Sequence, residues 1–125
     1  MANISKPQIR DIIFKKYDGH CAYCGCLIKR ESFTIDHINA KYRGFPEWQI
    51  KHQNLIRGTD DIENYNPCCQ SCNSSKSTLS IESWRKEITL KVGRLNRDVS
   101  GYRLLKRFGL IEEKQNPVKF YFENF

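Results

Sequence analysis

The chain has 125 residues, 39% of them hydrophobic, which suits one domain with a modest core that a structural metal could supplement. Its 21 lysines and arginines exceed its 14 acidic residues, and the formal net charge of +7 favours a polyanionic partner such as nucleic acid. No apolar stretch is long enough to cross a bilayer, and no secretory signal pattern begins the sequence. We therefore expect a cytoplasmic protein with reduced thiols.

The predicted elements begin with an N-terminal helix. Ser5 is the expected N-cap, and Pro7 suits the first turn because its missing N–H has no helical partner there. Four apolar residues follow at helical spacing: Ile9, Ile12, Ile13 and Tyr17. The turn residues Asp18 and Gly19 end the pattern, and we expect the helix to pack against the segment that follows.

Two short strands are expected next. Residues 33–38 are rich in β-branched and aromatic side chains, and residues 65–68 form a second run that Pro67 keeps short. Residues 39–63 between them lack a clean period, so we predict a long loop, a kind of connection that tends to be functional. A helix should start within residues 70–73.

The last third of the chain predicts two helices and a strand. From Ser80, a candidate cap, apolar residues recur every three or four positions, and Gly93 and Gly101 are expected to interrupt the helix. This apolar stripe, more often core than docking surface, consists of Trp84, Ile88, Val92, Leu95 and Val99. A last short helix is indicated by Tyr102, Leu105 and Phe108. Residues 118–122 alternate like a terminal strand, which we place on the N-terminal helix.

Four cysteines form two identical Cys-x-x-Cys pairs: Cys21, Cys24, Cys69 and Cys72. Each pair can reach one ion from a tight turn, and two pairs supply the tetrahedral thiolate set of a structural zinc site. The 44 residues from 25 to 68 between the pairs exceed the spacing of compact zinc modules, so the ion should tie the base of an inserted segment. Cys26 and Cys68 offer competing registers; we prefer the symmetrical one and treat both as non-ligands.

The dipeptide Asp36-His37 lies between the two pairs and suits phosphodiester hydrolysis. An imidazole can accept a proton from water near neutral pH, and carboxylate or amide oxygens are ligands that Mg²⁺ prefers. Neighbours on a regular strand point to opposite faces, so both side chains could serve one phosphate only at a bulge, a strong twist or a strand end. Without further context the pair would be ordinary surface residues.

Three segments together resemble the HNH endonuclease family: Thr34-Ile35-Asp36-His37-Ile38, Glu63-Asn64, and Cys69-Gln70-Ser71-Cys72-Asn73-Ser74-Ser75-Lys76. That family has a ββα-metal (His-Me finger) core, in which two strands and a helix clamp one divalent ion, and many members add a Cys₄ zinc. The resemblance spans residues 21–76, under half of the chain. It implies that His37 is the general base that deprotonates water and that Asp36 is a ligand of a catalytic Mg²⁺ or Mn²⁺.

The same resemblance assigns two asparagines. Asn64 would orient the histidine and brace the loop, and Asn73 would offer its side chain to the catalytic ion. Family members often carry histidine at this last position, so the chain would be an H-N-N variant. Taken alone, Asn73 could simply cap a helix, and Asn66 competes with Asn64.

Basic side chains are expected to bind the phosphates of DNA. Residues 85–107 carry eight basic and two acidic side chains, and the difference of six accounts for most of the net charge of +7. The side chains expected to contact nucleic acid are Lys41, Arg43, Lys76, Arg85, Arg94 and Arg97.

These features predict an α+β protein, a single domain over residues 1–125. A ββα-metal core with a Cys₄ zinc at 20–77 is flanked by the N-terminal helix and by a basic helical extension over 78–125. The resemblance implies metal-dependent nicking or double-strand cleavage of DNA with 5′-phosphate and 3′-hydroxyl products, as in small phage, mobile-element or restriction-type proteins in a bacterial cell. The alternative is a zinc-stabilised nucleic-acid-binding module without catalysis. No membrane partner is expected, and a homodimer or a second protein subunit stays open.

Overall fold

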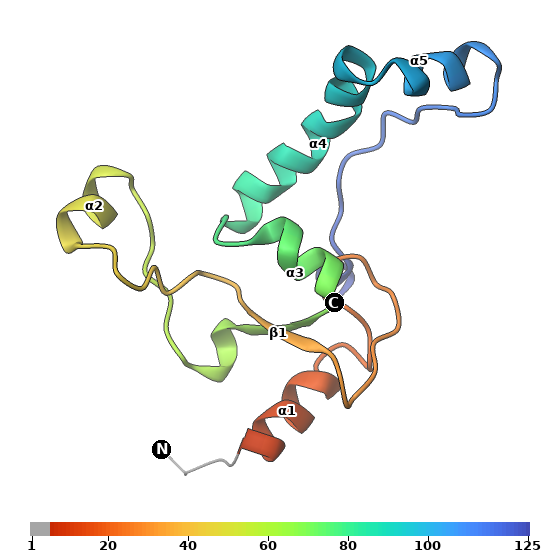
Figure 1. Ribbon diagram of the computed structural model, residues 1–125. Coiled ribbons are helices and arrows are strands. Elements are labelled where there is room, and N and C mark those ends of the chain that lie inside the picture. Colours follow the sequence, from red (N-terminus) through yellow and green to blue (C-terminus); the bar gives the residue numbers. More distant parts are fainter. Residues whose placement is uncertain (1–5) are drawn as a thin grey trace. The chain divides into compact units, whose positions relative to one another are not determined.

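The computed structural model describes residues 6–125 and forms two compact units (Figure 1). The first unit comprises Met1–Ile81 with Phe120–Phe125, and the second comprises Glu82–Lys119. Ser5, the predicted N-cap, lies outside the described residues. The predicted core at 20–77 falls within the first unit.

The first unit opens with α1 (Lys6–Lys15), which confirms the predicted N-terminal helix. Ile13 is buried, and the neighbouring Phe14 packs against Phe33 with ring centroids 5.6 Å apart. Arg10 lies over the same Phe33 ring at 4.1 Å and donates a hydrogen bond of 3.1 Å to the Phe33 carbonyl. The helix is thereby fixed to the residue that precedes the first strand.

A two-stranded antiparallel sheet forms the centre of this unit. The strands are β1 (Thr34–His37) and β2 (Tyr65–Cys68), and Asp36 pairs with Asn66 while His37 pairs with Tyr65. Helix α3 (Gln70–Lys76) follows β2 directly, and Figure 1 shows α3 continuing from β2 beside the hairpin. Both strands and the helix start agree with the sequence-based expectation, and the mixed helix and sheet content confirms the α+β class.

The connection between the strands is more ordered than predicted. It contains α2 (Glu47–His52) and a 3₁₀ turn, η1 (Ile62–Asn64), so the prediction of a loop without helix was wrong. Pro46 takes the N-cap position of α2, and Ile50 is its one buried residue, which makes the helix too short for a visible apolar period. Arg57 fixes the connection by donating hydrogen bonds of 2.9 to 3.1 Å to three carbonyls, those of Lys41, Tyr42 and Phe45.

The predicted terminal strand over 118–122 is also wrong. The segment ends in a second 3₁₀ turn, η2 (Tyr121–Asn124). Its backbone forms hydrogen bonds with the first cysteine turn (residues 21–24) and not with α1. Tyr121 N donates to Tyr23 O at 3.0 Å, and Phe122 N donates to Ala22 O at 2.8 Å. The alternating aromatic side chains therefore pack around Tyr23 rather than along a sheet.

The second unit consists of α4 (Ile81–Asp98), whose first residue belongs to the first unit, α5 (Ser100–Arg107) and the segment that follows α5. Gly93 does not interrupt α4, contrary to expectation, and the break falls at the extended residue Val99. Glu113 ties the unit together through Asn96, Tyr102 and Lys106 at 2.6, 3.0 and 2.7 Å.

In the predicted apolar stripe Trp84 is buried, but Val92, Leu95 and Val99 are 39% to 43% exposed, so most of the stripe is not core. Among the described residues, no helix combines the length and apolarity needed to cross a membrane.

The close approach of residue 58 to residue 39 predicts a stability effect. Gly58 N donates to Ala40 O at 2.8 Å, and a Cβ at position 58 would lie 1.7 Å from the Asn39 carbonyl oxygen. Gly58→Ala is expected to lower the free energy of unfolding by about 1–3 kcal/mol, because the backbone must shift. The control is Gly93→Ala, which meets no atom within 4 Å and should instead stabilise α4 by about 0.5–1 kcal/mol. Thermal denaturation followed by circular dichroism measures both, and equal melting temperatures would contradict the expectation.

Candidate active site

The four paired cysteines meet at one point of the first unit. The sulfur atoms of Cys21, Cys24, Cys69 and Cys72 all lie within 4.8 Å of one another, and 3.9 Å separates the sulfurs of Cys24 and Cys69. Backbone N–H groups point at two sulfurs: Tyr23 N donates to Cys21 and Cys72 N donates to Cys69, each at 3.4 Å. Four such thiols within reach of one ion could hold a metal, in the symmetrical register that we preferred.

The two remaining cysteines lie outside this set of four. Cys68 is fully buried, and its sulfur lies 3.3 Å from the Thr34 hydroxyl on the neighbouring strand. Cys26 is exposed after the first turn, where its carbonyl accepts a hydrogen bond from Cys21 N at 2.8 Å.

Asp36 is buried at the middle of the hairpin, with 5% of its surface exposed. Its Oδ2 accepts a hydrogen bond of 2.5 Å from the Tyr23 hydroxyl and lies 3.0 Å from Lys76 Nζ. Burial first, and then the charge of Asp36, raises the pKa of Tyr23 far above its ordinary value, so the phenol keeps its proton and donates. Lys76 also donates to the His37 carbonyl at 3.0 Å, which joins α3 to the end of β1.

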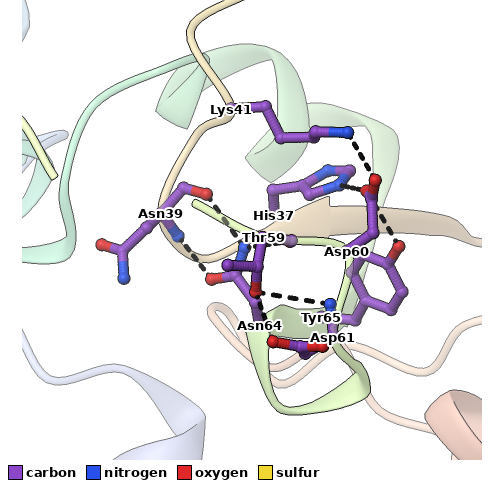
Figure 2. Close-up of polar contacts among 8 residues, drawn as sticks. All are labelled: His37, Asn39, Lys41, Thr59, Asp60, Asp61, Asn64 and Tyr65. Carbon is purple, nitrogen blue, oxygen red and sulfur yellow. Dashed lines mark hydrogen bonds and ion pairs between the residues drawn. The ribbon is translucent and has the colours of Figure 1, made fainter. Parts of the chain in front are cut away.

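His37 is the last residue of β1, and its side chain is 30% exposed. Its Nε2 lies 3.0 Å from Asp60 Oδ1, and its ring meets the Tyr65 ring edge-on at 5.0 Å (Figure 2). Asp60 also pairs with Lys41 and accepts a hydrogen bond of 3.2 Å from the Tyr65 hydroxyl. Hydrogen bonds from Lys41 first and then from His37 lower the pKa of Asp60 well below its ordinary value. No sequence pattern distinguishes Asp60 from the other acidic residues of the long connection.

Asn64 closes the connection around the strand end, as Figure 2 shows. Its Oδ1 accepts from Asn39 N at 2.9 Å, and its Nδ2 donates to the carbonyls of Asn39 and Thr59 at 3.0 and 2.8 Å. The Asn64 carbonyl accepts from Ile38 N at 2.8 Å. Asn64 thus fixes the two residues after His37 and the residue before Asp60.

Asp36 and His37 line one cavity of about 320 Å³. Lys41 and Arg43 line the same cavity, together with Tyr42, whose hydroxyl donates to the Thr78 carbonyl at 2.9 Å. His37 lies at the end of β1 and both residues line the cavity, although Asp36 contacts Tyr23 and Lys76 while His37 contacts Asp60. Asn73 is half-buried in the first turn of α3 and is not among the residues that line this cavity.

The residues expected to contact nucleic acid differ in accessibility. Lys41 and Arg43 line the cavity, but Lys76 has no exposed side-chain surface and pairs with Asp36, so the expectation of a phosphate contact at Lys76 was wrong for this arrangement. In the second unit, three arginines lie 2.8–3.0 Å from acidic neighbours: Arg85 from Glu82, Arg94 from Glu87 and Arg97 from Asp98. These pairs offset part of the positive charge of α4.

Comparison with known proteins identifies the family of the segment that carries this site. Residues 21–79, which contain both cysteine pairs, the hairpin and α3, match the family model described as HNH endonuclease. This segment belongs to the HNH endonuclease family. The HNH segment therefore coincides with the elements that surround the cavity.

Two proteins are similar over most of the chain. The SPbeta prophage-derived protein YoqL of Bacillus subtilis (strain 168), whose name assigns it to the HNH endonucleases, is 31% identical over 107 residues. The match covers 81% of this chain but 40% of YoqL, so the chain spans less than half of that curated relative. The crystal structure of the Type II-C Cas9 enzyme from Actinomyces naeslundii is similar in fold, with a TM-score of 0.51 and 20% identity over 93% of this chain and 12% of Cas9.

The buried pair between Asp36 and Lys76 predicts a stability effect. Lys76→Ala leaves the Asp36 carboxylate buried without its cation, which is expected to lower the free energy of unfolding by about 3–5 kcal/mol. Lys51→Ala on the exposed face of α2 is the control and should change it by less than about 0.5 kcal/mol. Urea denaturation compares the two variants. If Lys76 served only to bind DNA, the two variants would unfold at equal urea concentrations.

The sulfur cluster, formed by the thiols of Cys21, Cys24, Cys69 and Cys72, predicts that the fold depends on a bound metal ion. Purified protein is expected to carry one tightly bound ion per chain, measured by plasma mass spectrometry, and its removal by a chelator should unfold the first unit. Cys72→Ser should lose the ion, whereas Cys26→Ser should keep it. Retention of the ion by Cys72→Ser would contradict this assignment.

Proposed function

We propose that the chain is a metal-dependent endonuclease that hydrolyses DNA phosphodiester bonds, with His37 as the general base. The observation that carries this proposal is the shared cavity of Asp36 and His37, lined also by Lys41 and Arg43, inside a segment of the HNH family. A proton acceptor, a carboxylate and two cations around one open space suit the attack of water on a phosphodiester.

Each side chain has a task in this reaction. The His37 imidazole takes the proton of the attacking water, for which its partly exposed position at the strand end gives access. Lys41 and Arg43 bind the phosphates of the cleaved strand and hold it in the cavity. Asn64 keeps the connection closed around His37 through its three hydrogen bonds to Asn39 and Thr59.

Asp36 would hold the catalytic Mg²⁺ or Mn²⁺, with Asn73 as the second protein ligand. Both polar contacts of Asp36 described above fall on Oδ2, and the residue lines the cavity, so a hard oxygen donor remains for a cation. When bound, the ion would neutralise charge on the scissile phosphate and on the leaving 3′ oxygen.

The sulfur cluster would hold zinc in a structural role. Four cysteine thiolates form the closed donor set that structural zinc sites use, and they leave no open position for a substrate. The protein would act on DNA in the cytoplasm of a bacterial cell, which agrees with the prophage origin of YoqL. It would act alone or with a second subunit.

Nicking of supercoiled plasmid tests the proposal. Wild type is expected to convert plasmid to the open-circular form with Mg²⁺ or Mn²⁺ and not with EDTA. His37→Ala should lower the rate by about 100- to 10,000-fold, because water then lacks its base. The control is His52→Ala, an exposed residue at the end of α2. Equal rates for wild type and His37→Ala would instead favour a zinc-stabilised module that binds nucleic acid without cleaving it.

A further inference from the structure

Asp60 meets the ring of His37 and two further donors at one carboxylate. Oδ1 lies 3.0 Å from His37 Nε2 and accepts a hydrogen bond of 3.2 Å from the Tyr65 hydroxyl, while Oδ2 pairs with Lys41 (Figure 2). Lys41 comes from the segment after β1, and Tyr65 is the first residue of β2. Lys41 and Tyr65 therefore fix the Asp60 carboxylate from two segments of the chain, and the fixed carboxylate contacts the imidazole.

The charge state of Asp60 decides which ring nitrogen carries the proton. Hydrogen bonds from Lys41 and His37 lower the pKa of Asp60, so the carboxylate is ionised and can only accept hydrogen bonds. Nε2 of His37 must then be the donor. In the neutral ring the lone pair lies on Nδ1, because a neutral imidazole has one protonated nitrogen.

We infer that Asp60 is a positioning residue for His37, which holds the imidazole with Nδ1 free to accept the proton of the attacking water. This inference rests on the proposed role of His37 as the base. When that proton moves from water to Nδ1, the remaining hydroxide forms a bond to phosphorus, the P–O3′ bond breaks with its electron pair on the leaving 3′ oxygen, and the ring becomes an imidazolium. Asp60 keeps its own protonation state and stabilises the positive ring, as a buried or tethered carboxylate does for a histidine base in other hydrolases.

The fold supplies a second constraint on the same ring. Tyr65 packs edge-on against His37 at an interplanar angle of 88°, and its hydroxyl binds the oxygen of Asp60 that faces Nε2. Rotation of the imidazole about its long axis would break the contact with Asp60 and the contact with Tyr65 together. The Asp60 side chain is 56% exposed, and an exposed ion pair adds little to stability, so its removal should leave the fold intact.

Steady-state cleavage of a duplex by four variants tests the inference: Asp60→Ala, His37→Ala, the double variant, and Asp61→Ala as the matched control. Asp61 is the exposed neighbour of Asp60, and its side chain contacts Thr59 rather than His37. Asp60→Ala is expected to lower kcat by about 10- to 100-fold with little change in KM, because a misplaced base costs rate. The double variant should be no slower than His37→Ala, since Asp60 acts through that ring.

Three results would overturn the inference. Asp60→Ala with wild-type or faster kcat would make the contact neutral or inhibitory, and a double variant slower than His37→Ala by the full Asp60 factor would make Asp60 independent of the ring. A two-bond ¹H–¹⁵N correlation spectrum, assigned with His37→Ala, reads the tautomer without turnover. We expect the proton on Nε2 in wild type and mixed tautomers in Asp60→Ala; a proton on Nδ1 in wild type is the third overturning result. Should His37→Ala cleave normally, the proposed base fails, while the spectrum still reports on the Asp60 contact.

Discussion

The meeting of two short cysteine turns is the constraint on which the first unit depends. One turn follows α1, and the other lies where β2 becomes α3, so the four sulfurs join segments 45 residues apart in the chain. A hydrogen bond of 2.8 Å from Ala22 N to the Pro67 carbonyl ties the first turn to β2 as well. Between these fixed ends β1 pairs antiparallel with β2, and the connection that carries Asp60 and Asn64 joins the two strands.

Local sequence signals predicted the elements around this constraint. Both strands, the start of α3 near Gln70 and the N-terminal helix follow from side-chain periodicity, β-branched runs and turn residues, which act over a few positions. The symmetrical cysteine register follows from spacing alone. The prediction for Asp36 and His37 depended on their place between the cysteine pairs, and the structure adds that His37 closes the strand.

Partners that lie far apart in the sequence were not predictable. Lys76 resembles a surface cation by position, and only the packing of α3 beside β1 shows that it is buried against Asp36. Asp60 has no local pattern that separates it from Asp61, and its role depends on where the connection folds back. Residues 118–122 alternate weakly as a strand would, yet Tyr121 and Phe122 form backbone hydrogen bonds with the first cysteine turn. In each case tertiary contacts decide what local propensity leaves open.

Tyr23 stands between Cys21 and Cys24, and its hydroxyl reaches Asp36 at 2.5 Å. One residue thus belongs to the thiol turn through its backbone and to the buried carboxylate through its side chain, while the rings of Phe120 and Phe122 enclose it. A shift of the first cysteine turn would therefore also move the hydroxyl that holds the buried acid at the centre of the hairpin.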